Sequence, residues 1–225
     1  MSIPQIDGPR LEPQSGKAEQ LVIISHGYGA DGQDLIGLAP HWQRLLPNAA
    51  FVAPNAPERC DGNPMGYQWF PITSLNPQAM FAGVESAGPV LNAFIDEQLA
   101  HYGLSDSQLA LVGFSQGTMM SLHVGLRRKN SPACIIGYSG TLAGPEHLKQ
   151  EMTVKPPVLL VHGDADEMIP AQATMMAAQA LGDLEVSAQW HVVPNLGHGI
   201  DPTGLEMGGR FLHAAFTGGL EQAGE

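Results

Sequence analysis

Short apolar runs, rich in β-branched residues, recur along the chain with amphipathic stretches of helix length between them. Strands buried on both faces of a sheet have unbroken apolar runs, whereas half-exposed strands alternate. The runs lie at 21–24, 50–53, 109–112, 134–136 and 158–161, and a further strand is expected at 184–193. Helical spacing occurs at 84–99, 119–126, 171–181 and about 205–216. Strand alternating with helix predicts a mostly parallel sheet covered by helices on both faces, an α/β fold.

Two segments interrupt this alternation. Residues 1–18, rich in Pro, Gly and polar side chains, are expected to form an edge hairpin or an extended lead-in. Residues 55–82 read as one long loop that contains Trp69 and Phe70. Loops of that length in a compact domain are usually functional or disordered, and the aromatic content favours a functional loop on the substrate side.

The pattern predicts one domain over 1–225, because a chain of this length without repeats or a linker favours a single large unit. Such a domain buries about 70% of its unfolded surface, so its core needs no metal or disulfide. Within the first helical stretch, Gly88-Pro89 predicts a kink or a delayed helix start.

Charge and composition exclude several classes. The 10 Lys and Arg against 22 Asp and Glu give a formal charge of −12, the wrong sign for a nucleic-acid binder or for docking on anionic lipid. No segment approaches about 18 unbroken apolar residues, and the N-terminus has neither the basic start nor the apolar run of a signal peptide. The two cysteines do not form a secreted disulfide framework. These features predict a soluble, cytoplasmic protein that binds neither nucleic acid nor membrane.

The segment 109–120 carries the most informative motif, a predicted strand followed by Gly113-Phe-Ser115-Gln-Gly117 and a predicted helix. This is the context of a nucleophile elbow, in which a sharp turn projects the serine Oγ from the sheet edge and leaves no room for a Cβ two residues to either side. The helix that begins there directs its first amide, that of Gln116, at developing negative charge.

A serine nucleophile needs a base that is oriented by a carboxylate, and in the elbow topology the acid and then the histidine follow the serine. The predicted strand at 158–161 leads into Asp164 and Asp166, at the strand end where parallel sheets present chemistry. Spacing does not choose between these two, and both could instead cap the following helix.

Among nine histidines, His198 fits the base best, because it lies between glycines on a loop after the last predicted strand. His191 lies within that strand and His123 on a helix face, so packing roles are expected for both. His162 ends a strand and is expected to be structural, with local hydrogen bonds.

The glycine-rich segment Gly27-Tyr-Gly29-Ala-Asp-Gly32 has two interpretations. It matches the dinucleotide fingerprint, which would make the chain an NAD-binding oxidoreductase. That interpretation needs an acidic residue at the end of the next strand, which instead ends in Ala53-Pro54-Asn55. The alternative is an oxyanion-hole loop, whose Tyr28 backbone N–H would act beside that of Gln116.

No cofactor or metal is expected. The groups His26, Asp31, Asp34 and His162, Asp164, Asp166 do not match a metal-ligand spacing.

With these segments in view, the chain resembles the phospholipase/carboxylesterase branch of the α/β-hydrolases, which contains the acyl-protein thioesterases. The resemblance spans residues 8 to about 217, and Gly-Phe-Ser-Gln-Gly is more specific than the general elbow pattern. The motifs that carry it are His26-Gly-Tyr-Gly-Ala-Asp-Gly32, Gly113-Phe-Ser-Gln-Gly117, His162-Gly-Asp-Ala-Asp166-Glu-Met-Ile-Pro170 and Gly197-His198.

The resemblance, and not the spacing, assigns the acid to Asp166, three residues after the glycine of the His-Gly-x-x-Asp run. It implies cofactor-free hydrolysis of carboxylic esters, with thioesters or lysophospholipids as alternative substrates. Ser25 departs from the leucine that usually precedes His-Gly in the family, which should affect packing more than chemistry.

The hypothesis is a serine carboxylesterase with Ser115, Asp166 and His198 as the triad and no large lid, because no insertion after the strand at 134–136 is long enough for one. An open site favours small to medium esters. The expected acyl-binding wall consists of Met65, Trp69, Phe70, Ile72, Leu75, Met168, Ile169 and Leu196. The competing interpretation is a loop pinned to the core by its aromatic residues.

A non-catalytic binding protein on the same fold is the remaining alternative, which the intact Ser, Asp and His order disfavours. The expected partner is a small-molecule ester or thioester. Weak association into a homodimer is compatible with the sequence, although no specific apolar stripe predicts it.

Overall fold

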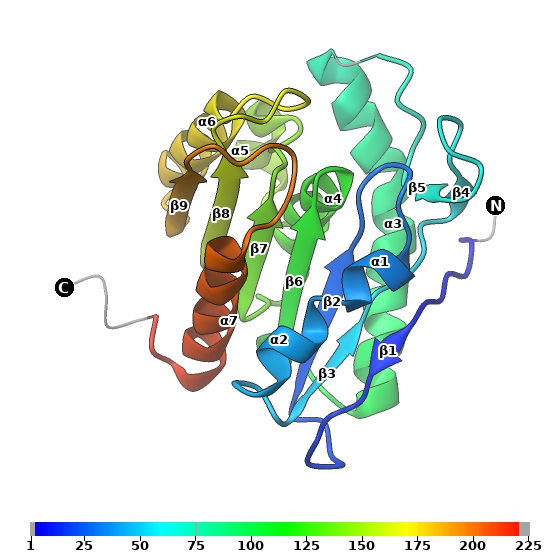
Figure 1. Cartoon of the computed structure of the whole chain (residues 1–225), viewed down its shortest axis with the longest axis vertical. Coiled ribbons are helices and arrows are strands. Elements are labelled where there is room, and N and C mark those ends of the chain that lie inside the picture. Colours follow the sequence, from blue (N-terminus) through cyan, green and yellow to red (C-terminus); the bar gives the residue numbers. More distant parts are fainter. Residues whose placement is uncertain (1–2, 75, 221–225) are drawn as a thin grey trace.

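The computed structural model describes residues 3–74 and 76–220. Its centre is a seven-stranded sheet in the order β1-β3-β2-β6-β7-β8-β9, parallel throughout except for β1 against β3 (Figure 1). The strands are β1 (Arg10–Leu11), β2 (Gln20–Ser25), β3 (Ala49–Val52), β6 (Leu109–Phe114), β7 (Cys134–Tyr138), β8 (Val158–Gly163) and β9 (Ala188–Val193). A separate antiparallel pair, β4 (Glu58–Arg59) and β5 (Tyr67–Gln68), lies outside this sheet.

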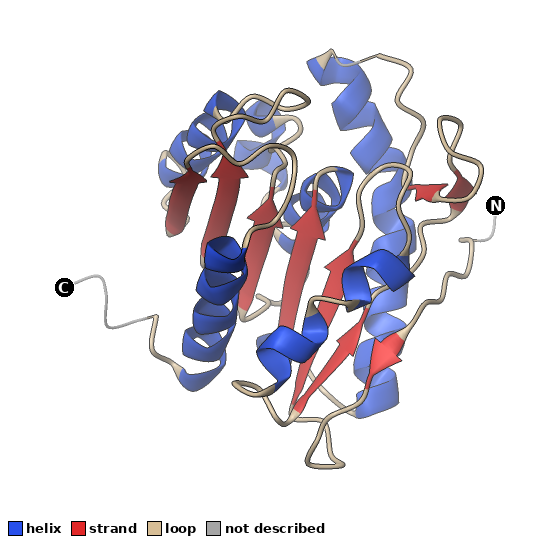
Figure 2. Ribbon diagram, viewed as in Figure 1, coloured by secondary structure: helices blue, strands red, loops and turns tan. Residues whose placement is uncertain are grey.

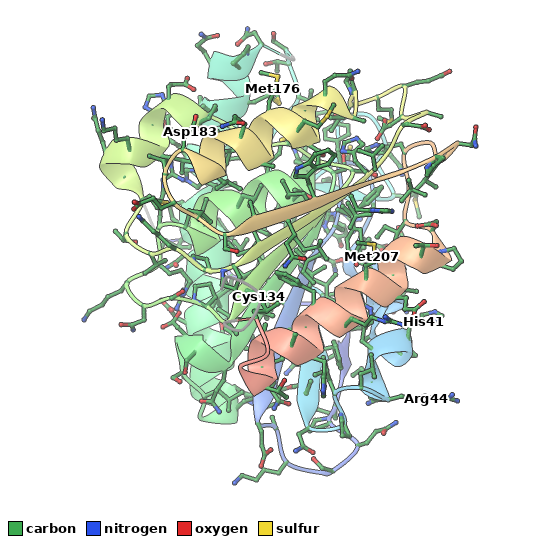
Figure 3. All side chains as sticks on the ribbon, turned by 90° about the vertical axis from the view of Figure 1, so that its left-hand side faces the viewer. His41, Arg44, Cys134, Met176, Asp183 and Met207 are labelled. Carbon is green, nitrogen blue, oxygen red and sulfur yellow. The ribbon has the colours of Figure 1, made fainter. Side chains whose placement is uncertain are left out.

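Helices cover both faces of the sheet, as the sequence pattern predicted (Figure 2). The helices are α1 (Gly32–Ile36), α2 (Ala39–Gln43), α3 (Pro77–Tyr102), α4 (Gln116–Gly125), α5 (Leu148–Glu151), α6 (Gln172–Gly182) and α7 (Pro202–Thr217). α1, α2 and α7 pack on one face, and α3, α4 and α6 on the other. In Figure 3 the β9 edge faces the viewer, with α6 above it and α7 below.

The two apolar cores explain why the central strands are unbroken apolar runs. Along β2, Leu21 and Ile23 belong to the core under α3 and α4, while Val22 and Ile24 belong to the core under α1, α2 and α7. All four side chains are fully buried. Because both faces of β2 pack against a core, the strand has no polar face. Burial of each of these side chains contributes about 1.5–3 kcal/mol to the free energy of unfolding.

The last strand is shorter than predicted. β9 begins at Ala188, and residues 184–187 form the turn that leads into it. Glu185 has a φ of +60°, and its N–H donates to the carbonyl of Gly182. This left-handed backbone at the end of α6 is incompatible with a strand at that point.

The 26-residue helix α3 corrects two expectations. It begins at Pro77, so residues 77–82 are helical and do not belong to a loop. The Asn76 side chain accepts a hydrogen bond from the Ala79 N–H, and proline suits the first helical turn. The helix also continues through Gly88-Pro89, so a delayed start there is wrong. Pro89 lacks an N–H and can leave the Glu85 carbonyl without its helical donor, but packing on α4 maintains the helix.

Residues 3–18 lie along the β3 edge as an extended lead-in. β1 pairs with β3 and makes no hairpin within the segment. Gly8 approaches the edge closely, because a Cβ there would overlap the Ala53 carbonyl. No helix within the described residues is long and apolar enough to cross a membrane.

Candidate active site

Ser115 occupies the turn between β6 and α4 with a φ of +53°. Such a backbone costs a non-glycine residue about 1–3 kcal/mol and is often found at functional sites. The Ser115 N–H donates to the Tyr138 carbonyl at 2.9 Å, which ties the turn to β7. A Cβ on Gly113 would overlap the Gly117 backbone, and a Cβ on Gly117 would overlap the Ser25 carbonyl. The close crossing of β2, β6 and α4 therefore requires both glycines of the motif.

The segment after β2 forms a tight turn beside Ser115. The Ala30 N–H donates to the Gly27 carbonyl at 3.2 Å, and Gly29 has a φ of +78°, a conformation that favours glycine. A Cβ on Gly27 would lie 3.1 Å from the Ser115 Cβ, so this turn and the serine are direct neighbours. No hydrogen bond among the described residues uses the backbone N–H of Tyr28 or Gln116. Both donors are thus free for a ligand.

His26 orients this turn. The Ala56 N–H donates to His26 Nε2 at 2.9 Å, so Nδ1 carries the proton and donates to the Gly27 carbonyl at 2.7 Å. Burial lowers the pKa of His26, which favours this neutral form. Because the Gly27 carbonyl is held by the imidazole, the N–H of the same peptide, that of Tyr28, points the opposite way.

The loop before α3 is tied to both segments through buried groups. The Gln116 side chain accepts from the Trp69 N–H and donates to the Phe70 carbonyl, both at 2.9 Å. Trp69 Nε1 donates to the His26 carbonyl at 3.0 Å. Trp69 and Phe70 are only 1% and 3% exposed, so they are core residues and offer no surface to a substrate. The sequence did not predict this anchoring role of the Gln116 side chain, because nothing beyond its place in the elbow motif points to it.

Asp166 lies on the loop after β8 with its side chain fully buried. Its Oδ1 accepts from the N–H groups of Met168 and Ile169, each at 2.9 Å, and its Oδ2 lies 2.7 Å from Nδ1 of His198. Burial opposes ionisation, but the Ile169 N–H, the His198 imidazole and the Met168 N–H outweigh it and hold the pKa of Asp166 below its usual value.

Asp164, the other candidate acid, is exposed and makes no hydrogen bond to His198 among the described residues. Its Oδ1 accepts from the Asn195 N–H at 2.6 Å, which anchors the loop that carries His198. The Ala165 N–H donates to the Leu196 carbonyl at 3.0 Å, and Ser139 Oγ donates to the Gly199 carbonyl at 3.1 Å. The histidine loop is therefore held on both sides of His198.

The imidazole of His198 is 16% exposed and lies next to the serine turn. Its ring centre is 5.0 Å from that of Phe114, the residue before Ser115. Within the described chain, no hydrogen bond joins Ser115 Oγ to His198. In unliganded sites such bonds are often long and tighten when a substrate binds.

The other predicted wall residues lie in different settings. Met65 and Met168 are 81% and 69% exposed. Ile72, Ile169 and Leu196 are half-buried against the two cores. Leu75 lies outside the described residues. Ser25, the departure from the family pattern, is buried, and its Oγ has no hydrogen-bond partner in the described structure.

A cavity of about 610 Å³, which sequence reasoning missed, lies between the start of α3, the loop after β7 and α6. Its apolar lining includes Pro77, Met80, Leu142, Ala173, Met176 and Ala177. The loop that lines it passes beside the serine, because a Cβ on Gly140 would lie 2.8 Å from the Ser115 carbonyl oxygen. Met176 of α6 and Asp183, the residue that follows the helix, are labelled in Figure 3 and also line the cavity, which therefore extends along α6.

Within residues 3–74 and 76–220, no three His, Cys, Asp or Glu side chains are arranged to hold a metal ion.

The sheet order, the strained serine between a strand and a helix, and the Asp–His pair on the following loops define an α/β-hydrolase. The chain belongs to the phospholipase/carboxylesterase family, whose model matches residues 6–215.

Individual relatives agree with this assignment. Acyl-protein thioesterase 1 of Saccharomyces cerevisiae is 30% identical over 228 residues, covering 94% of this chain and 100% of the relative. Esterase YpfH of Escherichia coli is 28% identical over 192 residues, covering 84% and 80%. The crystal structure of esterase PE8 is 44% identical and superposes with a TM-score of 0.91, covering 94% of this chain and 99% of that one.

Proposed function

We propose that this chain hydrolyses small to medium carboxylic esters with Ser115 as nucleophile, His198 as general base and Asp166 as the acid that orients the base. As a member of its family the chain is an ester hydrolase. The observation that carries the residue assignment is the 2.7 Å contact between Asp166 Oδ2 and His198 Nδ1, beside a serine held at a φ of +53°.

The reaction proceeds in two halves. Ser115 Oγ attacks the acyl carbon while His198 Nε2 takes its proton, and the imidazolium then protonates the leaving alcohol. Water then attacks the acyl carbon while His198 Nε2 takes a proton from it, and the imidazolium returns this proton to Ser115 Oγ as the bond between Oγ and the acyl carbon breaks and the acid leaves. Asp166 stays ionised throughout, because the Met168 and Ile169 N–H groups stabilise its charge, and it keeps Nδ1 protonated so that Nε2 is free to accept.

The oxyanion hole consists of the Tyr28 and Gln116 N–H groups. Two observations support this assignment. Neither N–H donates to another described residue, and His26 fixes the orientation of the Gly27–Tyr28 peptide. Donors fixed before the reaction cost no reorganisation, and loss of one typically costs about 3–4 kcal/mol of transition-state stabilisation.

The apolar cavity beside the Gly140 turn takes the acyl chain. Its location replaces the predicted wall at Trp69 and Phe70, because those side chains are buried. Acyl thioesters are the second candidate substrates, favoured by the similarity to acyl-protein thioesterase 1 of Saccharomyces cerevisiae. A cytoplasmic location and a weak homodimer stay predictions, which cell fractionation and light scattering test.

Labelling by a fluorophosphonate probe tests the nucleophile. We expect the wild type to be labelled and Ser115→Ala to lose both labelling and ester turnover, because only the activated Oγ attacks phosphorus. The matched control is Ser121→Ala, which removes a buried hydroxyl of α4 that has no hydrogen-bond partner in the described structure. Labelling that persists in Ser115→Ala would refute the assignment.

A p-nitrophenyl ester series from acetate to palmitate, run beside a palmitoyl thioester, tests the acyl site. Ala173→Leu, which fills part of the cavity, should move the chain-length optimum to shorter esters and lower kcat/KM for longer ones by about tenfold, since a few methylenes are each worth about 0.8 kcal/mol. Met175→Ala on the outer side of α6 is the control. An optimum that is unchanged in Ala173→Leu would place the acyl chain elsewhere.

A further inference from the structure

A second buried histidine touches the carboxylate of Asp166. His162, near the end of β8, has a fully buried side chain, and its Nε2 lies 3.0 Å from Asp166 Oδ2. That oxygen is the one that His198 Nδ1 approaches to 2.7 Å. Two imidazoles from two different segments therefore converge on one carboxylate oxygen.

The proton on His162 can be placed from its other contacts. Its Nε2 also lies 2.8 Å from the Ile169 carbonyl oxygen, which can only accept. Nε2 therefore carries a proton, which it donates to Ile169 O, and the same polarised N–H lies against Asp166 Oδ2. On the other side of the ring, Nδ1 lies 2.6 Å from Thr174 Oγ1 of α6, whose hydroxyl can donate to it. The neutral imidazole thus satisfies every contact that it makes.

We propose that His162 is a positioning residue that holds Asp166 Oδ2 toward His198 and keeps the carboxylate a weak base. The proposal rests on the triad proposed above. The Met168 and Ile169 N–H groups bind Oδ1, the His198 imidazole bonds to Oδ2, and the His162 N–H is the other polar side-chain group in contact with Oδ2 among the described residues. The positive end of the His162 N–H, in contact with Oδ2, stabilises the negative charge of the carboxylate, so the proton stays on Nδ1 of His198 as the imidazolium forms.

Other titratable groups near this chain of contacts have separate partners. Asp164 accepts from the Asn195 N–H, and Glu167 of the same loop is exposed. α6 brings no titratable side chain, and Asp201 caps α7 through the Gly204 N–H. His191 of β9 is half-buried and stands in register with Val161. We therefore attribute a change in the pH profile of a His162 variant to Asp166 and His198.

Two substitutions separate the proposed role from simple packing. His162→Gln keeps an N–H donor near the position of Nε2 and removes the acceptor for Thr174. His162→Asn keeps a polar group near Nδ1 and removes the Nε2–H that lies beside Asp166. The readouts are kcat and KM for a p-nitrophenyl ester between pH 5 and 9, with thermal melting to show that each variant is folded.

We expect His162→Asn to lose about 10- to 100-fold in kcat, as other groups that orient a functional histidine do, while KM changes by less than about threefold. The acidic limb of its kcat/KM profile should move upward by about one pH unit, because Asp166 then binds the imidazolium of His198 more strongly. His162→Gln should recover most of kcat and the wild-type limb. The proposal would be overturned if folded His162→Asn keeps the acidic limb of the wild-type kcat/KM profile. It would also be overturned if both variants lose kcat equally.

If His162→Asn does not fold, Thr174→Val replaces it, with Thr174→Ser as its control. Removing the hydroxyl frees the His162 imidazole to rotate. The acidic limb of the kcat/KM profile should therefore move to higher pH in Thr174→Val and not in Thr174→Ser. Identical profiles for that pair would also overturn the proposal. Failure of the triad itself is distinguishable, because turnover would then survive in Ser115→Ala whatever the His162 variants do.

Discussion

Buried histidines show how one residue type takes different roles according to its partners. The two ring nitrogens of His26 both have partners, and they orient the Gly27–Tyr28 peptide. His123 on α4 is also buried, but its Nδ1 has no partner in the described structure. Burial and then the nearby Arg127 lower the pKa of His123 to about 4. This residue therefore packs as a neutral ring against Phe81, at a ring separation of 6.1 Å.

The lowered pKa of His123 predicts a loss of stability in acid. Between pH 6.5 and about pH 4, His123 is protonated in the unfolded chain and neutral in the folded chain. The free energy of unfolding therefore falls as pH decreases through this range. The slope from this residue is at most about 1.4 kcal/mol per pH unit. Urea unfolding from pH 7 to 4.5 should show a smaller decrease for His123→Leu than for the wild type.

Exposed His213 provides the control for that measurement. His213→Leu should keep the wild-type dependence of unfolding free energy on pH. If His123→Leu follows the wild-type curve as well, the acid sensitivity arises elsewhere.

At the scale of elements, the loop between β3 and α3 acts as a brace between two parts of the site. β5 bonds to the turn after β2 through the Tyr67 N–H and the Ala30 carbonyl, at 2.8 Å. Trp69 then joins the His26 carbonyl to the Gln116 side chain. The loop thereby fixes the spacing of the two segments that carry the proposed oxyanion donors.

Trp69→Phe should loosen this brace. It removes the Nε1 donor to the His26 carbonyl while keeping most of the buried ring, so the free energy of unfolding should fall by about 1–3 kcal/mol. Amide hydrogen exchange at residues 26–30 should accelerate, and kcat should fall by up to about tenfold. The matched control is Trp190→Phe on the open β9 edge, where the indole is 51% exposed and the expected change is below about 0.5 kcal/mol. Equal effects of the two substitutions would contradict a bracing role.

Charge acts at the scale of the whole molecule. The formal charge of −12 produces a negative potential around a site whose product is a carboxylate. At low salt this field extends tens of ångströms, because the Debye length is about 30 Å at 0.01 M and about 8 Å at 0.15 M. It favours the approach of neutral or cationic substrates and the departure of the acid.

Salt should therefore change specificity for charged esters. Raising the ionic strength from 0.01 to 0.3 M should lower kcat/KM for a cationic choline-type ester and raise it for a succinate half-ester, by a few-fold each. A neutral ester of similar size is the internal control and should change little. A succinate half-ester that is fastest at low salt would show that local charges at the site dominate.

Local sequence patterns were enough to predict the strands of the central sheet and to propose the order of serine, acid and histidine. Two-sided burial of parallel strands leaves an unbroken apolar signature, which predicted every central strand. The elbow glycines were readable because a crossing without room for a Cβ permits only glycine, as the contacts of Gly113 and Gly117 with neighbouring backbone explain. His198 was readable for a different reason, its place between glycines on a loop after the last predicted strand.

Contacts between side chains of distant segments became known from the fold. The sequence spacing left Asp164 and Asp166 equivalent, and the fold turns one toward Asn195 and the other toward His198. It buries Trp69 and Phe70, opens a cavity beside α6, and brings His162 to the oxygen that His198 shares. These contacts join residues from separate loops and elements, and local patterns along a chain carry no information about the direction in which a loop side chain points.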